Sequence, residues 1–493
     1  MKFHSTRDLN KTKYSAANVI KQGLADDGGL FVPEEIPQIS LDEISSFTSL
    51  SYPELASTIL GRFLSDYSHS ELLEYCQKSY SSDNFNDGAC PMIKVNENTF
   101  SLELWHGPTC AFKDMALQIM PHLLSRALKK TGETRTALIL TATSGDTGKA
   151  ALEGYKDVDQ IKICVFYPKN GVSTIQELQM VTQTGNNVKV CGVEGNFDDI
   201  QTGVKEIFSN SDIVLELDKK GYFLSSANSI NFGRLAPQIV YYFKAYCELL
   251  SQNEITLGDK INVCVPTGNF GNILAAYIAK LMGLPINKLI CASNSNNVLT
   301  DFLNTGRYDR NRDFYLTMSP SMDILISSNL ERLLYFTSNA TQTAEYMNML
   351  STRGYYQVSD EIKSKIDENF IGYFANESQT ADTIAKFYNI YDYLMDTHTA
   401  VAFSALESYR TEHLDNTKTV VASTASPYKF AQNVYRSIFS DDSYNDLEIL
   451  NELSLITGTK IPAPLLYLDK KEVRFTNVTT PENMYDEVLK FIE

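Results

Sequence analysis

Short apolar runs alternate with amphipathic stretches from about residue 90 onward, and this pattern predicts strands that alternate with helices. Three predicted strands, each with a tight turn and a helical pattern behind it, cover residues 137–142, 262–266 and 419–424. The alternation is typical of βαβ units around a largely parallel sheet, so it predicts an α/β fold. Because ligands bind at the carboxyl ends of strands in such sheets, we expect the functional site in the three loops that follow these strands.

The rest of the chain has weaker patterns. Residues 1–90 predict helices with a turn at 26–29, which favours a separate N-terminal unit. Residues 300–395 are rich in Asn, Ser and Tyr with weak periodicity, so they predict helices and long surface loops. Residues from about 440 predict a C-terminal extension, and no internal repeat is visible.

The charge of the chain narrows the classes of partner. Its 493 residues carry a formal net charge of −17, which repels nucleic-acid backbones and anionic membrane surfaces. We therefore expect binding neither to nucleic acid nor to membranes. If the ligand is a phosphate, positive charge and backbone amides must be concentrated locally.

The eight cysteines are scattered, with no C-x-x-C pair and no neighbouring histidines, so we expect no metal site and no disulfide framework. Cys164 and Cys264 lie inside apolar runs and predict buried thiols. The first 23 residues lack the apolar segment of a signal peptide, and no run of about 18 apolar residues occurs. These features predict a cytoplasmic protein.

The loop of residues 268–272 has the composition that a phosphate site needs. Gly268 and Gly271 allow backbone amides to converge, and Asn269, Phe270 and Asn272 complete a turn at the start of a predicted helix. A simple tight turn is the alternative interpretation. The spacing of a dinucleotide-binding loop is absent.

A second glycine-rich turn covers residues 144–148. Lys149 follows it, but the glycine spacing and the residue after the lysine do not match a nucleotide-binding P-loop. Two interpretations stay open. The turn could hold a small ligand, or Asp146 or Thr147 could simply cap the helix.

Lys113 lies in an apolar segment at the start of the helical pattern 115–128. Most lysines are solvated surface charges. A lysine flanked by Ala111 and Phe112 is, however, expected to be partly desolvated, which lowers its pKa and makes its amine a nucleophile toward carbonyl groups.

These segments together resemble the threonine synthase family, whose members are pyridoxal-phosphate (PLP) enzymes of the tryptophan-synthase-β-like fold (fold type II). The likeness runs nearly from end to end. It is carried by the segments 1–8, 22–33, 106–109, 111–114, 143–148, 228–231 with Arg234, 266–271, 319–323, 398–400, and 423–425 with Lys429 and Phe430.

The resemblance implies a role for each matching residue. Lys113 matches the lysine that carries PLP as a Schiff base and then acts as the catalytic base. Residues 268–272 match the loop that holds the cofactor phosphate, and Thr424 matches the hydroxyl partner of the pyridine nitrogen. A hydroxyl there moderates the electron sink, because unlike a carboxylate it does not enforce a fully protonated ring.

The resemblance also implies the substrate site. Asn228, Ser229 and Arg234 match residues that contact the substrate phosphate, and Ser144 and Thr147 are expected near the substrate carboxylate. From local sequence alone, residues 228–231 would be a helix cap and Arg234 a surface charge.

Family membership implies conversion of O-phospho-L-homoserine and water to L-threonine and phosphate, by γ-elimination and β-addition of water. It also implies a two-lobed core with parallel sheets at residues 91–440, with a smaller lobe at about 135–225. Because the chemistry needs water to be excluded and then admitted, we expect the smaller lobe to close around the substrate. An N-terminal domain at 1–90 and a C-terminal extension at 441–493 complete the expected architecture. The oligomeric state, monomer or homodimer, is left open.

One departure from the family pattern keeps rival functions open. Where the family commonly reads T-A-H-P-A-K-F, this chain has Ser426 and Tyr428 in place of the histidine and the second alanine. A sibling PLP lyase that releases a 2-oxo acid is one rival, and a non-catalytic PLP-binding protein is another. Related folds place an amide near the phenolic oxygen of PLP, and contact between Asp146 and PLP is also left open.

Overall fold

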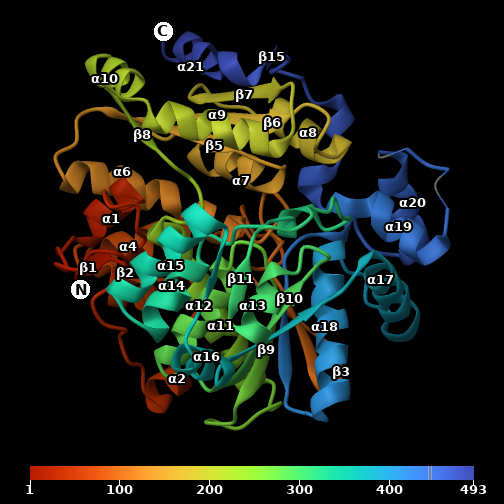
Figure 1. The fold of residues 1–493 in the computed structure, drawn as a ribbon. Coiled ribbons are helices and arrows are strands. Elements are labelled where there is room, and N and C mark those ends of the chain that lie inside the picture. Colours follow the sequence, from red (N-terminus) through yellow and green to blue (C-terminus); the bar gives the residue numbers. More distant parts are fainter. Residues whose placement is uncertain (442, 446) are drawn as a thin grey trace.

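The computed structural model describes residues 1–441, 443–445 and 447–493. Within them, a six-stranded sheet forms the larger lobe, in the lower half of Figure 1. Neighbouring strands are parallel, except that β3 pairs with β4 in the antiparallel sense. In spatial order the strands are β13 (Phe370–Phe374), β10 (Ile286–Ser293), β9 (Ile261–Pro266), β14 (Thr419–Ser423), β4 (Thr99–Glu103) and β3 (Met92–Asn96).

A second, fully parallel sheet forms the smaller lobe, in the upper half of Figure 1. Its outer strand β15 comes from the C-terminal extension, which therefore contributes to the fold of this lobe. In spatial order the strands are β15 (Val478–Thr479), β7 (Val188–Val193), β6 (Ile161–Pro168), β5 (Thr136–Ala142) and β8 (Tyr222–Ser225).

Helices cover both sheets and bury their apolar faces against the strands. Those before and within the smaller lobe are α5 (Asp114–Leu117), α6 (Met120–Lys130), α7 (Asp146–Tyr155), α8 (Thr174–Val181), α9 (Phe197–Ser209) and α10 (Ser211–Lys219). Those of the larger lobe are α11 (Phe232–Ser251), α12 (Gly271–Leu281), α13 (Val298–Thr305), α14 (Leu330–Thr337), α15 (Ala340–Arg353), α16 (Asp360–Asp367), α17 (Glu377–Tyr391) and α18 (Thr397–His413). The last helices are α19 (Ala431–Phe439), α20 (Glu448–Thr457) and α21 (Met484–Ile492).

The N-terminal unit contains four helices among the described residues, as its sequence pattern predicts: α1 (Ala16–Gln22), α2 (Leu41–Phe47), α3 (Tyr52–Phe63) and α4 (His69–Ser79). Ser40, Ser51 and Ser68 each begin a helix in a capping box with a glutamate three residues later. The sequence pattern missed the short antiparallel pair β1 (Phe3–Ser5) and β2 (Phe31–Pro33).

The three strand-to-helix units predicted around the site are confirmed by β5 with α7, β9 with α12, and β14 with α19. The prediction of helices and loops for residues 300–395 missed β13, which extends the large sheet, and the antiparallel pair of β11 (Arg307–Asp309) and β12 (Tyr355–Gln357). The helix predicted from residue 115 to 128 is interrupted between α5 and α6. The predicted domain boundaries at residues 90 and 440 stay a prediction.

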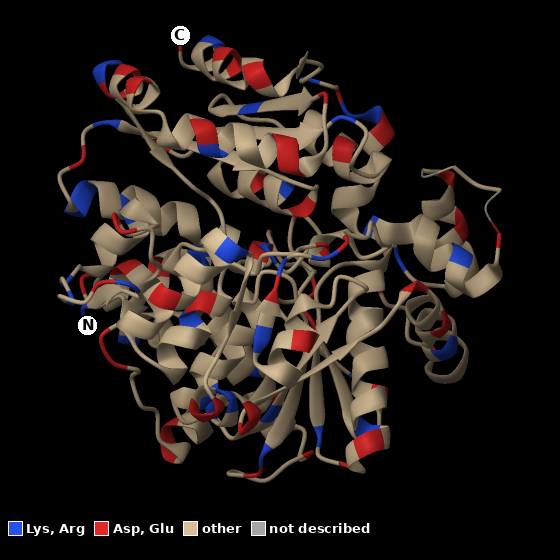
Figure 2. Cartoon of the chain, viewed as in Figure 1, with Lys and Arg blue, Asp and Glu red and all other residues tan. Residues whose placement is uncertain are grey.

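Charged residues lie mainly on the outer helices and loops of both lobes, and the strands carry few (Figure 2). Cys164 and Cys264 are buried free thiols, as predicted. In the described ranges, no helix combines the length and the apolar character needed to cross a bilayer.

Candidate active site

Lys113 lies between the two lobes, in a segment fixed to the end of β14. Ala111 forms an antiparallel bridge with Ala425, and the backbone N–H of Phe112 donates to the carbonyl oxygen of Thr424 at 2.8 Å. β4 and β14 are neighbours in the large sheet, so their carboxyl ends bring Lys113 and Thr424 together. The structure therefore brings together Lys113 and Thr424, the two predicted site residues that are farthest apart in the sequence.

The surroundings of the Lys113 amine favour its neutral form. Its side chain is 11% exposed, and Nζ lies 4.8 Å from the centre of the Phe112 ring. Burial lowers the pKa of Lys113 below its ordinary value, and the charges of Lys429 and Arg234 lower it further, whereas Asp146 acts in the opposite direction. The interpretation of Lys113 as a solvated surface charge is wrong.

Asp146 is the nearest carboxylate to that amine, with Oδ2 3.6 Å from Lys113 Nζ. Its other oxygen, Oδ1, lies 2.7 Å from Nζ of the fully buried Lys429 and accepts a hydrogen bond from Gln176 at 3.0 Å. Burial alone would raise the pKa of Asp146, but Lys429 and Lys113 outweigh it and hold this pKa well below the usual range. Asp146 is thus a fixed negative charge between two lysines.

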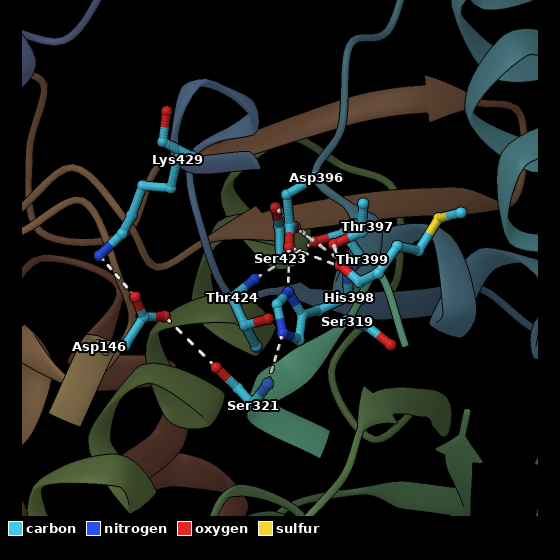
Figure 3. A network of polar contacts seen from close by, with 12 residues as sticks. Asp146, Ser319, Ser321, Asp396, Thr397, His398, Thr399, Ser423, Thr424 and Lys429 are labelled. Atoms are coloured by element: carbon cyan, nitrogen blue, oxygen red, sulfur yellow. Dashed lines mark hydrogen bonds and ion pairs between the residues drawn. The ribbon is translucent and has the colours of Figure 1, made fainter. Parts of the chain in front are cut away.

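Figure 3 shows how this ion pair continues into the larger lobe. Ser321 Oγ donates to Asp146 Oδ2 at 3.5 Å, and the Ser321 backbone N–H donates to His398 Nε2 at 3.1 Å. His398 Nδ1 lies 2.7 Å from Asp396 Oδ2. The sequence placed His398 and Lys429 in family-like segments but assigned them no role, because nothing in their spacing reveals these contacts.

The loop of residues 268–272 joins the end of β9 to the start of α12. Phe270 adopts a left-handed conformation with φ of 62°, so the chain turns sharply before the first turn of the helix. A Cβ at Gly268 would lie 2.9 Å from the carbonyl oxygen of Ser321, and that position therefore has room only for glycine. The geometry combines the predicted tight turn with a helix N-terminus, where backbone amides can face an anion.

The turn between β5 and α7 is held by Thr143, whose hydroxyl oxygen accepts from the backbone N–H groups of Gly145 and Gly148. No described side chain caps α7, so the capping by Asp146 or Thr147, one of the two interpretations left open, is wrong. Ser144 and Thr147 are partly exposed, and in the described residues neither hydroxyl has a hydrogen-bond partner. Their free hydroxyls suit the alternative interpretation, a cradle for a small ligand.

Arg234 lies in the first turn of α11 and is only 4% exposed, so the interpretation as a surface charge is wrong. Its Nη1 donates to the carbonyl oxygen of Ala227, and its Nε has no partner. Burial lowers the pKa of Arg234 to about 10, and among the described residues no carboxylate forms an ion pair with it. A buried guanidinium in this state is suited to an anionic ligand.

The neighbouring residues divide between the two expected roles. Asn231 caps α11, with its side-chain oxygen accepting from the Gly233 N–H at 2.9 Å. Asn228 is exposed, and the partly buried Ser229 accepts a hydrogen bond from Asn329 at 3.3 Å. Asn231 therefore caps the helix, as the local sequence predicts, whereas Asn228 and Ser229 do not.

Ser426, which replaces the histidine common in the family pattern, is fully buried. Its backbone N–H donates to the carbonyl oxygen of Cys110 at 3.0 Å, and its hydroxyl oxygen accepts from the Tyr428 N–H. Ser426 therefore has a structural role close to Thr424.

These residues fit PLP. An amine of lowered pKa lies at Lys113, and a glycine turn at a helix N-terminus suits a phosphate. The Thr424 hydroxyl has no partner among the described side chains and lies at the carboxyl end of a strand.

Comparisons with known families agree. Three family models match in chain order: Threonine synthase N terminus at residues 2–80, Pyridoxal-phosphate dependent enzyme at 93–424, and Threonine synthase, C-terminal at 399–492. The chain belongs to the threonine synthase family. It is a PLP-dependent enzyme of fold type II, and its cofactor is PLP.

This chain is similar to two differently named groups of proteins. Threonine synthase of Pseudomonas aeruginosa is 38% identical, over 89% of this chain and 90% of its own length. Human Threonine synthase-like 1 is 41% identical over 86% of this chain, but this chain spans only 58% of that relative. The chain thus covers about three fifths of the relatives with the second name.

Solved structures confirm the fold class. PLP-bound threonine synthase from Brucella melitensis has a TM-score of 0.88 and 34% identity, covering 100% of this chain and 98% of its own. The yeast threonine synthase structure has a TM-score of 0.89 and 32% identity, with the same coverage. The predicted two-lobed α/β fold with N-terminal and C-terminal threonine synthase domains is confirmed.

Proposed function

We propose that this enzyme is a threonine synthase, which converts O-phospho-L-homoserine and water to L-threonine and phosphate. The observation that carries the proposal is Arg234, a buried guanidinium with an unpaired Nε that influences the pKa of Lys113. The cofactor phosphate is expected at residues 268–272. A separate buried cation that forms no ion pair with the described residues therefore favours a substrate that carries its own phosphate.

The proposed roles for the cofactor follow from the site. Lys113 would hold PLP covalently, residues 268–272 would hold its phosphate, and the Thr424 hydroxyl would face its pyridine nitrogen. When bound, PLP supplies an electron sink for the carbon atoms of the substrate.

The substrate would lie between the lobes. Arg234, Asn228 and Ser229 would bind its phosphate, and the Ser144 and Thr147 hydroxyls would bind its carboxylate at the N-terminus of α7. The backbone N–H groups of Asp146 and Thr147, in the first turn of this helix, would add to that anion site.

Lys113 Nζ would take the α-proton of the substrate and later return protons to the product skeleton. The fixed charge of Asp146 stabilises the protonated amine after each transfer, and Lys429 keeps Asp146 ionised. Asp146 belongs to the smaller lobe and Lys429 to the larger one, so their pairing also supports closure of the lobes over the substrate and exclusion of water.

One feature of the sequence favours an alternative reaction with a different product. Ser426 stands beside Thr424 where the family commonly has histidine, and the chain is 41% identical to relatives named Threonine synthase-like 1. A phospholyase would convert the same substrate and water to phosphate, ammonia and a 2-oxo acid.

The test is product analysis after incubation of the PLP-loaded enzyme with O-phospho-L-homoserine. Equal amounts of threonine and phosphate support the proposal. Phosphate with a 2-oxo acid assigns the phospholyase reaction, and the absence of phosphate release contradicts both. The Lys113→Ala variant, incubated in the same way, is the negative control.

A further inference from the structure

Asn329 lies between two loops of the candidate site. It is fully buried and precedes α14, which Figure 1 shows beside α12 and the N-terminal β2. Its Nδ2 donates to the carbonyl oxygen of Asn269 at 3.1 Å and to Ser229 Oγ at 3.3 Å. One amide group therefore contacts both the turn proposed for the cofactor phosphate and a residue proposed for the substrate phosphate.

Arg332 fixes which way this amide points. Its Nη1 donates to Asn329 Oδ1 at 2.5 Å, while Nε donates to the carbonyl oxygen of Phe31 at 3.0 Å and Nη2 to that of Ile230 at 2.6 Å. A guanidinium can only donate, so the Asn329 atom that faces it must be the oxygen. The amide nitrogen is then left to face the two loops.

The orientation has a consequence for Ser229. Because its oxygen accepts from Asn329, its own O–H proton is available to another acceptor. Within the part of the chain that the structure describes, no acceptor is paired with that proton. The hydroxyl is thus set as a donor toward a ligand.

We propose that Asn329 is a positioning residue that couples the two phosphate sites. It holds the carbonyl of Asn269 in place for the cofactor loop and directs the Ser229 proton to the substrate phosphate. Arg332 sets its orientation and ties it to the N-terminal domain through Phe31. This inference rests on the proposed function, which supplies the roles of Ser229 and of residues 268–272.

The substitution Asn329→Asp tests the idea with almost no change in volume. The new carboxylate can still accept from Arg332, but its second oxygen cannot donate. It would repel the Asn269 carbonyl and take the Ser229 proton away from the ligand. The substitution therefore opposes anion binding at both loops while adding an ion pair inside the protein.

Two binding measurements provide the readout. PLP is titrated into the apoenzyme, and inorganic phosphate is titrated into the PLP-loaded enzyme, both by calorimetry. We expect Asn329→Asp to weaken each affinity about tenfold or more, the scale of a lost hydrogen bond to a charged group. Asn339→Asp, an exposed cap of α15 that an aspartate also satisfies, is the matched control and should change neither.

A double-mutant cycle separates this role from a merely structural one. In a Ser229→Ala background, Asn329→Asp should lose most of its effect on phosphate affinity and keep its effect on PLP affinity. Additive effects on phosphate affinity would overturn the inference. If Ser229→Ala alone leaves phosphate affinity unchanged, the proposed substrate site fails instead.

Arg332→Lys keeps the test decisive if Asn329→Asp does not fold. A lysine keeps the positive charge but loses the fork that orients the amide, so we expect phosphate affinity to fall about threefold or more. Unchanged phosphate and PLP affinities in a folded Arg332→Lys enzyme would contradict the positioning role.

Discussion

Asp146 Oδ1 and Lys429 Nζ lie 2.7 Å apart across the boundary between the lobes, and both side chains are almost completely buried. Breaking such a pair leaves an uncompensated charge in the interior. We therefore expect Lys429→Gln or Asp146→Asn to lower the free energy of unfolding by about 3 to 5 kcal/mol, measured by urea denaturation.

The exposed pair of Glu74 and Lys78 is the matched control, since its atoms are 2.6 Å apart but each side chain is 57% exposed. Glu74→Gln should lower the free energy of unfolding far less, because solvent screens an exposed ion pair. Equal losses for the buried and the exposed pair would show that Asp146 and Lys429 do not join the lobes as described.

The lowered pKa of Lys113 predicts how the apoenzyme captures PLP as pH changes. Only the neutral amine attacks the aldehyde, so the capture rate should level off at a lower pH than for an ordinary lysine, whose pKa is 10.5. Asp146 raises the pKa of Lys113 and Lys429 lowers it. The pH profile of the capture rate, measured by stopped-flow absorbance, should therefore move to lower pH in Asp146→Asn and to higher pH in Lys429→Gln. A shift of both profiles in the same direction would disprove the electrostatic assignment.

Asp114, next to Lys113, predicts a pH-dependent stability. Burial raises its pKa from 3.8 to about 6, although Thr109 donates two hydrogen bonds to it. Between these values the folded state binds more protons than the unfolded state, so stability falls as pH rises through this window. The difference in unfolding free energy between the native chain and Asp114→Asn should change by about 2 kcal/mol from pH 4 to pH 6. A difference independent of pH would contradict the raised pKa.

Arg234 should affect stability and function in opposite directions. Arg234→Met removes a buried charge without an ion-pair partner, so the apoenzyme should become more stable. The same change removes the proposed phosphate contact and should raise the KM for O-phospho-L-homoserine by about tenfold to a hundredfold. Thermal unfolding and steady-state kinetics measure the two effects. A less stable enzyme with an unchanged KM would assign Arg234 a structural role instead.

Much of the fold could be predicted because the site is built from strand-to-helix units with strong local patterns. The loops after β5, β9 and β14 were expected at the carboxyl ends of parallel strands, and they lie there. The strands that sequence missed are short or depend on distant partners. β1 has three residues, and β15 has two and exists only by pairing with β7.

The site was predictable where a residue type carries its own chemistry, and less so where the contact spans the chain. Lys113 and Thr424 were expected, but the pairing of Asp146 with Lys429 has no local signal, because 283 positions separate them. The hydrogen bonds that hold the turn at residues 143–148 were not predicted either, although they are local. Thr143 accepts from the N–H groups of Gly145 and Gly148, and the cap by Asp146 or Thr147, one of the two interpretations left open, is not formed.

The most direct test of the central claim is reductive trapping of the PLP-loaded enzyme with borohydride, followed by peptide mass mapping. We expect the visible absorbance band to disappear and a pyridoxyl-phosphate label to be found on Lys113 in stoichiometric amount. A label on another lysine, or full retention of PLP and activity in Lys113→Ala, would contradict the account.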